Sequence, residues 1–243
     1  MNKVSTRVAI LTLGILLMGL MDGIGLCDTT VKLNFNTAIT VGTNTIDSIQ
    51  IQLFDSQAPI TVSNFLKYVN DNRYDNTIIH RSVSDLIILG GGFTPQVNGQ
   101  NEVTALNMIS NYGTIQDEFS STCSNVRGTI AMAKMSDNPN SATSQWFINV
   151  ADNSDFLDGG YAVFGEVIGD GMTFVDAIND LSTYDLSGYY GNNLTSIPLY
   201  NYANSASNFV TITSISVISE PSSFVLLILG FAGMIVCSWL RRK

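Results

Sequence analysis

The sequence has few of the residues that build metal sites or disulfide frameworks. It contains one histidine and three cysteines in 243 residues. One histidine without a Cys/His cluster cannot build a zinc site, so we expect no bound metal. Cys27 and Cys237 lie near the two ends of the chain, which leaves Cys123 without an obvious partner. We therefore expect no internal disulfide framework.

Basic residues are also scarce. The chain has 11 Lys and Arg against 20 Asp and Glu, and five of the basic residues lie in the two end segments. Residues 28–218 hold 18 acidic and 6 basic side chains, a net charge of −12. Such a surface repels nucleic acid, so we expect no nucleic-acid partner. The acids are scattered, which favours a solvated surface over an acidic binding site.

The chain does have an apolar run at each end. A positively charged start precedes the run at residues 8–21. This order is typical of a secretory signal peptide, and the run is short for a membrane span. We expect residues 1–27 to be this signal, with cleavage between Asp22 and Asp28. Lipidation of Cys27 and an uncleaved anchor stay open as alternatives.

The second apolar run covers residues 224–240 and is followed by Arg241-Arg242-Lys243. Its 17 residues are at the lower limit for a membrane span, and its basic end should stay on the cytoplasmic side. Residues 219–243 resemble the PEP-CTERM sorting signals of Gram-negative bacteria, with Ser219-Glu220-Pro221 in place of Pro-Glu-Pro. The resemblance implies recognition by an exosortase. A plain C-terminal transmembrane anchor is the alternative.

Between these ends, residues 28–218 are expected to form one domain. Alternation of apolar residues with glutamines at 49–53 predicts a half-buried strand. Apolar residues at i, i+3, i+4 and i+7 from Val62 predict a helix that begins near Pro59. A second helix is predicted at 171–181. Further stretches of strand type lie at 29–45 (a strand and a loop), 77–81, 86–89, 128–133, 145–149, 161–167 and 209–217.

Many short strands with two helices indicate a mainly β sandwich or barrel. Residues 182–208 are rich in Tyr, Asn and Ser and show no clear periodicity. We expect them to form an ordinary surface loop.

Five sequence blocks make the prediction more specific. They are YDNTIIHR at 74–81, LGGGF at 89–93, GTIAMA at 128–133, SATSQWFI at 141–148, and FLDG at 156–159 with VFG at 163–165. In this order they resemble the bacterial form of the cyclophilin family of peptidyl-prolyl cis–trans isomerases. The resemblance implies a closed eight-stranded antiparallel β-barrel capped by two α-helices. Terminal hydrophobic helices would be added by the two end segments.

The reaction of that family is rotation about an X-Pro bond. Its barrier of roughly 18–20 kcal/mol comes from amide resonance, so no nucleophile, metal or cofactor is required. A catalyst must hold the proline ring and stabilise the twisted amide more than the planar one. Arg81 matches the family's catalytic arginine, and a fixed guanidinium keeps its charge. A surface arginine in a salt bridge is the alternative for this residue.

Matching positions also imply the substrate-binding residues. The walls of an apolar proline pocket would be Leu86, Ile87, Phe147, Leu157 and Tyr161. Ala133 would present backbone groups to the peptide and Gln145 would donate a hydrogen bond. Phe156 stands where animal cyclophilins often carry Trp, which implies weak cyclosporin binding. Met132 and Trp146 should face the core, and His80 should be structural, on the strand face opposite Arg81.

One position departs from the family pattern. Leu89 stands where the family usually has a glutamine that helps to hold the arginine and the peptide carbonyl. Leucine can do neither, so we expect reduced activity with the pocket retained.

Three functional hypotheses follow. The first is an isomerase, expected to be monomeric, that acts on proline-containing polypeptides in the periplasm or at the cell surface. The second is a catalytically weak binding module for proline-containing segments of surface or matrix proteins, which Leu86, Ile87 and Leu89 favour. The third is a structural component of an extracellular matrix, suggested only by the sorting tail.

Overall fold

The computed structural model describes residues 28–41, 44–191, 194–202 and 205–218. The predicted signal peptide and sorting tail lie outside the described residues. In the part of the chain that is described, no helix is both long and apolar enough to cross a membrane.

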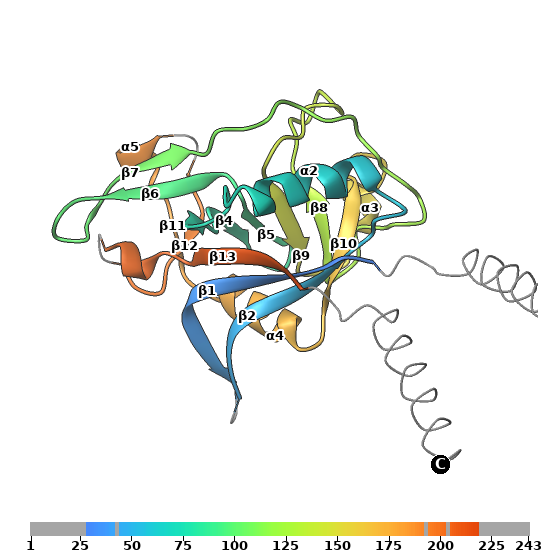
Figure 1. Cartoon of the computed structure of the whole chain (residues 1–243). Coiled ribbons are helices and arrows are strands. Elements are labelled where there is room, and N and C mark those ends of the chain that lie inside the picture. Colours follow the sequence, from blue (N-terminus) through green and yellow to red (C-terminus); the bar gives the residue numbers. More distant parts are fainter. Residues whose placement is uncertain (1–27, 42–43, 192–193, 203–204, 219–243) are drawn as a thin grey trace, which may run out of the picture.

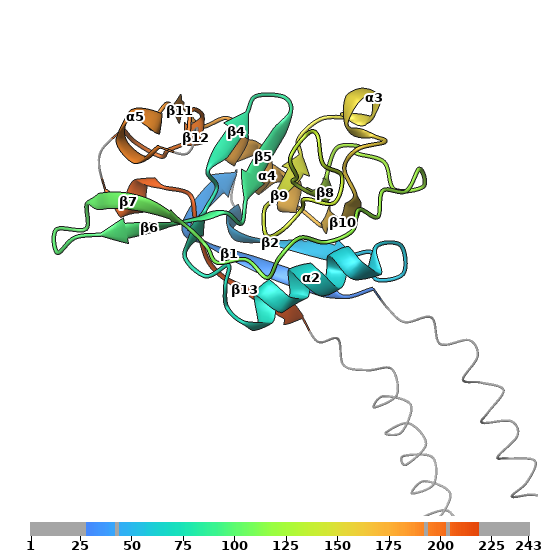
Figure 2. The ribbon, with the colours of Figure 1, turned by 90° about the horizontal axis from the view of Figure 1, so that it is seen from above.

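Most strands form one curled antiparallel sheet (Figures 1 and 2). Its order is β3-β13-β1-β2-β10-β8-β9-β5-β4. The bounds are β1 Thr30–Val41, β2 Asn44–Leu53, β3 Thr77–Ile78, β4 Arg81–Val83, β5 Ile87–Gly90, β8 Thr129–Met132, β9 Trp146–Asn149, β10 Val163–Ile168 and β13 Thr211–Ile218. The predicted strands at 49–53, 128–133, 145–149, 161–167 and 209–217 are thereby confirmed within a few residues.

The closed eight-stranded barrel is not what the structure shows. The sheet has nine strands, and no pairing joins its end strands β3 and β4 within the described residues. The predicted single strand at 77–81 is divided, because the chain changes partner there. Ile79 donates its amide to Val210 beside β13 (2.9 Å), whereas His80 donates to Leu89 on β5 (3.0 Å). Only Ile79 and His80 separate β3 from β4 along the chain, so the curl of the sheet brings its two end strands together.

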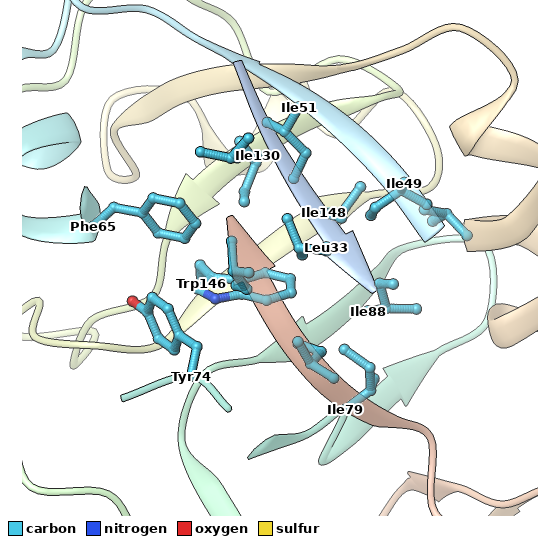
Figure 3. Packing of buried hydrophobic residues seen from close by; sticks show 14 of the residues in the cluster. Leu33, Ile49, Ile51, Phe65, Tyr74, Ile79, Ile88, Ile130, Trp146 and Ile148 are labelled. Carbon is cyan, nitrogen blue, oxygen red and sulfur yellow. The ribbon is translucent and has the colours of Figure 1, made fainter. Parts of the chain in front are cut away.

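Two helices, α2 (Pro59–Asn70) and α4 (Gly171–Asn179), lie above and below the curled sheet in Figure 1 and pack into the same core. Both match the predicted helices. Their apolar faces meet the buried strand residues in the main core, where Phe65 packs on Phe164 and Phe174 packs on Phe35. Trp146 lies at the centre of this core (Figure 3) and is fully buried, and Met132 is 2 % exposed. The prediction that both face the core is confirmed.

The first turn of α2 is stabilised from outside the helix. Its N-cap residue, Ala58, has no side-chain atom that could accept hydrogen bonds from the free backbone amides of the first turn. The carboxylate of Glu118 takes this role, accepting hydrogen bonds from the amides of Ile60 (3.0 Å) and Thr61 (2.7 Å) and from the Thr61 hydroxyl. A negative charge at a helix N-terminus is also favoured by the helix dipole.

Residues 182–208 are not the ordinary surface loop that was predicted. They contain β11 (Thr183–Tyr184), α5 (Ser187–Tyr190), β12 (Ile197–Pro198) and a short 3₁₀ turn, η2 (Ala206–Asn208). Leu186, Leu194, Ile197 and Leu199 are buried in a second core. This core also receives side chains from a hairpin of β6 (Phe93–Val97) and β7 (Val103–Met108), which stands apart from the main sheet (Figure 2). The Ser82 amide of β4 donates to the Ser196 carbonyl (2.8 Å), so this segment covers the edge of β4.

Candidate active site

The register of the sheet places three predicted site residues and two further residues in one row across five strands. Arg81 on β4 is directly opposite Leu89 on β5, and Leu89 is opposite Phe147 on β9. Phe147 is in turn opposite Ala131 on β8, which is opposite Val163 on β10. Directly opposite residues of antiparallel strands point to the same face. One face of the curled sheet therefore carries Arg81 at the end of an apolar row.

Side chains around this row form a third apolar cluster, separate from the main core. We call it the pocket cluster, and its members are Phe54, Val83, Leu86, Ile87, Leu89, Cys123, Ala131, Ala133, Phe147, Leu157, Tyr161 and Val163. Leu86, Leu89, Leu157 and Tyr161 are only half-buried. The cluster thus has a buried floor, formed by residues such as Phe147, and a rim that is open to solvent.

The aromatic part of the rim is well defined. Tyr161 meets Phe147 edge-on, with 5.6 Å between the ring centroids. The Lys134 ammonium lies 4.7 Å from the Tyr161 ring centroid, a cation–π distance. The rings of Tyr161 and Phe147 are almost perpendicular, at 80°, so the edge of one ring meets the face of the other.

Arg81 is the first residue of β4, and His80 lies in the two-residue link before it. Arg81 is exposed and forms no ion pair with any residue that the structure describes. His80 is 6 % exposed and meets the Phe93 ring edge-on at 4.9 Å. Burial lowers the pKa of His80 to about 4, against the opposing influence of the Ile78 carbonyl and the Gln145 side chain. His80 is therefore neutral at pH 7.

Gln145 lies beside the glycine run that follows β5. A side chain at Gly92 would meet the Gln145 side chain at 3.0 Å. Gly91 has φ +74, and a Cβ there would lie 2.7 Å from the Ser144 carbonyl oxygen. Gly91 is thus needed for the close packing of this loop on the segment that carries Gln145 and Trp146, and a side chain at Gly92 would displace the Gln145 side chain.

A model of the family "cyclophilin type peptidyl-prolyl cis-trans isomerase/CLD" matches residues 38–198. The chain belongs to the cyclophilin family. A peptidyl-prolyl cis-trans isomerase of Acinetobacter baylyi is 46% identical over 153 residues, covering 61% of this chain and 74% of that protein. Peptidyl-prolyl cis-trans isomerase B of Escherichia coli is 43% identical over 153 residues, covering 60% of this chain and 85% of that protein.

The fold of this cyclophilin is also similar to a solved structure. A Cryptosporidium parvum cyclophilin type peptidyl-prolyl cis-trans isomerase, crystallised in the presence of the dipeptide Ala-Pro, superposes with a TM-score of 0.55 at 23% identity. The alignment covers 79% of this chain and 99% of that one.

Two of the predicted substrate-binding residues, Phe156 and Ala133, differ from the others in their surroundings. Phe156, on the short helix α3 (Ser154–Leu157), is 59 % exposed and does not belong to the pocket cluster. The Ala133 amide donates to the Gln145 carbonyl (2.9 Å). Any backbone contribution of Ala133 to a peptide would therefore come from its carbonyl.

Sequence reasoning missed five members of the pocket cluster: Phe54, Val83, Cys123, Ala131 and Val163. Val83 lies two residues after Arg81 on the same strand, so strand alternation alone would have placed it on the Arg81 face. Phe54 and Cys123 lie outside the strands, where no periodic signal exists. No group of three His, Cys, Asp or Glu side chains that could hold a metal ion occurs in the described ranges.

Proposed function

We propose that this cyclophilin catalyses rotation about X-Pro bonds in exported polypeptides. The observation that supports this most is the position of Arg81. An exposed guanidinium with no ion-pair partner among the described residues stands at the end of an apolar row, directly opposite a pocket-cluster residue. A proline ring bound in the cluster would have its amide next to this charge.

The proposed mechanism needs only binding and electrostatics. The pocket cluster holds the ring and removes water from around the amide. Twisting the X-Pro bond returns the lone pair to the prolyl nitrogen, and Arg81 donates to that nitrogen. The interaction is stronger for the twisted amide than for the planar one, so it lowers the barrier. Arg81 keeps its charge throughout, and no proton is transferred.

We infer that the rate is lower than is usual for the family. Leu89 is the cross-strand partner of Arg81 and offers it no hydrogen bond. No side chain in the described part of the protein forms an ion pair with the Arg81 guanidinium.

The activity is tested with the full chain and an Arg81→Ala variant in a protease-coupled assay on a short X-Pro peptide. Removing a donor aimed at the developing charge should lower kcat by roughly 10²–10³-fold. Arg73→Ala is the matched control, because Arg73 contacts Ser110 and Tyr112 beside α2 and not the pocket cluster. A wild type no faster than Arg81→Ala would refute catalysis.

Leu89 also supports a second candidate function, a binding module for proline-containing segments. In that case wild type and Arg81→Ala would bind a proline peptide in a calorimetric titration, and neither would accelerate its isomerisation.

We further infer export to the periplasm or cell surface, a monomeric state, and membrane attachment or exosortase recognition through residues 219–243. The support is the sequence of the two ends of the chain. Fractionation of cells that make the full chain or a chain without residues 219–243 tests this, and equal release of both forms would refute a role of the tail.

A further inference from the structure

Three asparagines beside the pocket cluster are almost completely buried. Asn125 and Asn149 are 0 % exposed and Asn153 is 2 % exposed. Burying an amide without hydrogen bonds is costly, so side chains of this kind are retained where their donors and acceptors are used.

The three side chains form one hydrogen-bonded chain, which we call the asparagine chain. Asn149, the last residue of β9, is the middle member. Its Nδ2 donates to Oδ1 of Asn125 (3.2 Å), and its Oδ1 accepts from Nδ2 of Asn153 (2.8 Å). The same Nδ2 also donates to the Thr129 hydroxyl (2.9 Å), so both of its protons are used.

The two ends of the asparagine chain reach two residues of the pocket cluster. Nδ2 of Asn153 donates to the Leu86 carbonyl (2.9 Å). Nδ2 of Asn125 donates to the Tyr161 carbonyl (3.2 Å). Leu86 and Tyr161 are far apart in the sequence and stand on separate loops, yet a continuous line of amides connects them.

A residue with positive φ comes one or two positions before each of these residues. Asp85, before Leu86, has φ +55 in the turn between β4 and β5. Gly159 and Gly160 come directly before Tyr161, and Gly159 has φ +83. Glycine gives the chain more conformational freedom than other residues do. The asparagine amides add a side-chain hydrogen bond to each rim carbonyl, and the Leu86 carbonyl also accepts the Val150 amide (2.9 Å).

We propose that Asn125, Asn149 and Asn153 are positioning residues, which hold Leu86 and Tyr161 at a fixed separation across the proline pocket. Among the described residues, none of their side-chain hydrogen bonds is made to Arg81 or to its partner Leu89. Their effect is on how well a ring is bound and discriminated. The proposal rests on the proposed function, because it assumes that the pocket cluster receives proline.

The test uses the full chain with Asn149→Leu, which keeps the branched shape of the side chain and cuts the asparagine chain in the middle. Two rim residues would then have to be ordered by the peptide itself, a cost paid on binding. We expect KM for a short X-Pro peptide to rise about tenfold while kcat changes less than twofold. We also expect weaker discrimination between proline and its six-membered-ring homologue, a readout that general loss of stability does not move.

Asn36→Leu is the matched control, because Asn36 also makes two hydrogen bonds to backbone, at Phe209 and Thr211, but lies on β1 away from the pocket cluster. It should leave KM unchanged. Two variants replace Asn149→Leu if it does not fold. Asn149→Ser supplies one hydroxyl in place of the amide, and Asn153→Leu removes the bonds to Leu86 and Asn149 but leaves the bond between Asn149 and Asn125. For them the expected rise in KM is smaller, about threefold, because part of the chain remains.

An unchanged KM and unchanged ring discrimination in the folded variants would overturn the positioning role, and so would an equal effect of Asn36→Leu. A wild type that neither binds nor isomerises the peptide would instead refute the proposed function. The two failures are therefore distinguishable.

Discussion

The substitution Leu89→Gln should increase the isomerisation rate of this cyclophilin. Position 89 is directly opposite Arg81, and Cβ atoms of such pairs lie roughly 4.5–5.5 Å apart. A glutamine amide oxygen can cover that distance to the guanidinium. A hydrogen bond to a charged group is worth about 1.5–3 kcal/mol. If it acts fully in the transition state, kcat/KM rises about 10–100-fold, because about 1.4 kcal/mol corresponds to a factor of ten.

The same change has a cost in stability. Leu89 is half-buried in the pocket cluster, and replacing part of its apolar surface should lower the free energy of unfolding by about 1 kcal/mol. The fold should tolerate this loss. Rates are measured in the protease-coupled assay, and urea unfolding shows that each variant is folded.

Two controls separate the hydrogen bond from other effects. Leu89→Met changes the side chain without adding an acceptor for Arg81, and its rate should equal that of wild type. Leu89→Gln combined with Arg81→Ala should gain nothing over Arg81→Ala alone. A folded Leu89→Gln variant with the wild-type rate would refute the reasoning, since position 89 would then not limit the support of Arg81.

Two further predictions concern stability. Glu118→Gln should lower the free energy of unfolding by about 1 kcal/mol, because the helix α2 loses the charge at its N-terminus; the exposed Glu166→Gln should have no such effect in the same urea titration. The pKa of His80 is about 4 in the folded chain and 6.5 in the unfolded chain. Between these two values the unfolded chain binds a proton at His80 and the folded chain does not. The free energy of unfolding should therefore fall by roughly 3 kcal/mol as the pH drops from 7 to 4. His80→Gln should lose less stability than wild type between pH 7 and 4.5, and an equal loss would assign the pH dependence to other groups.

Strong periodicity made part of the fold predictable. The stripe that begins at Val62 and the alternation at 49–53 identified α2 and much of β2 because packing follows the same periods. The β6–β7 hairpin was missed. Pro95 lies within β6, and the register shifts between Gln96 and Val97, so neither strand shows a clean alternation. A change of strand partner, as between Ile79 and His80, leaves no mark in the sequence at all.

The candidate site was predictable to a different extent. The resemblance named most of the pocket residues, and the strand register then brought Arg81, Leu89 and Phe147 into one row. The asparagine chain was not predictable. Asn125 and Asn153 lie in loops, where asparagine is common for its turn geometry, and nothing in sequence spacing indicates that their side chains are buried.

The covered edge of β4 affects how this protein can interact with other polypeptide chains. A strand at the end of a sheet offers its free amides as a template on which another extended chain can pair and aggregate. The central amide of β4, next to Arg81, is already bonded to Ser196. This cover leaves β4 less open to pairing with the extended polypeptides on which the protein is proposed to act.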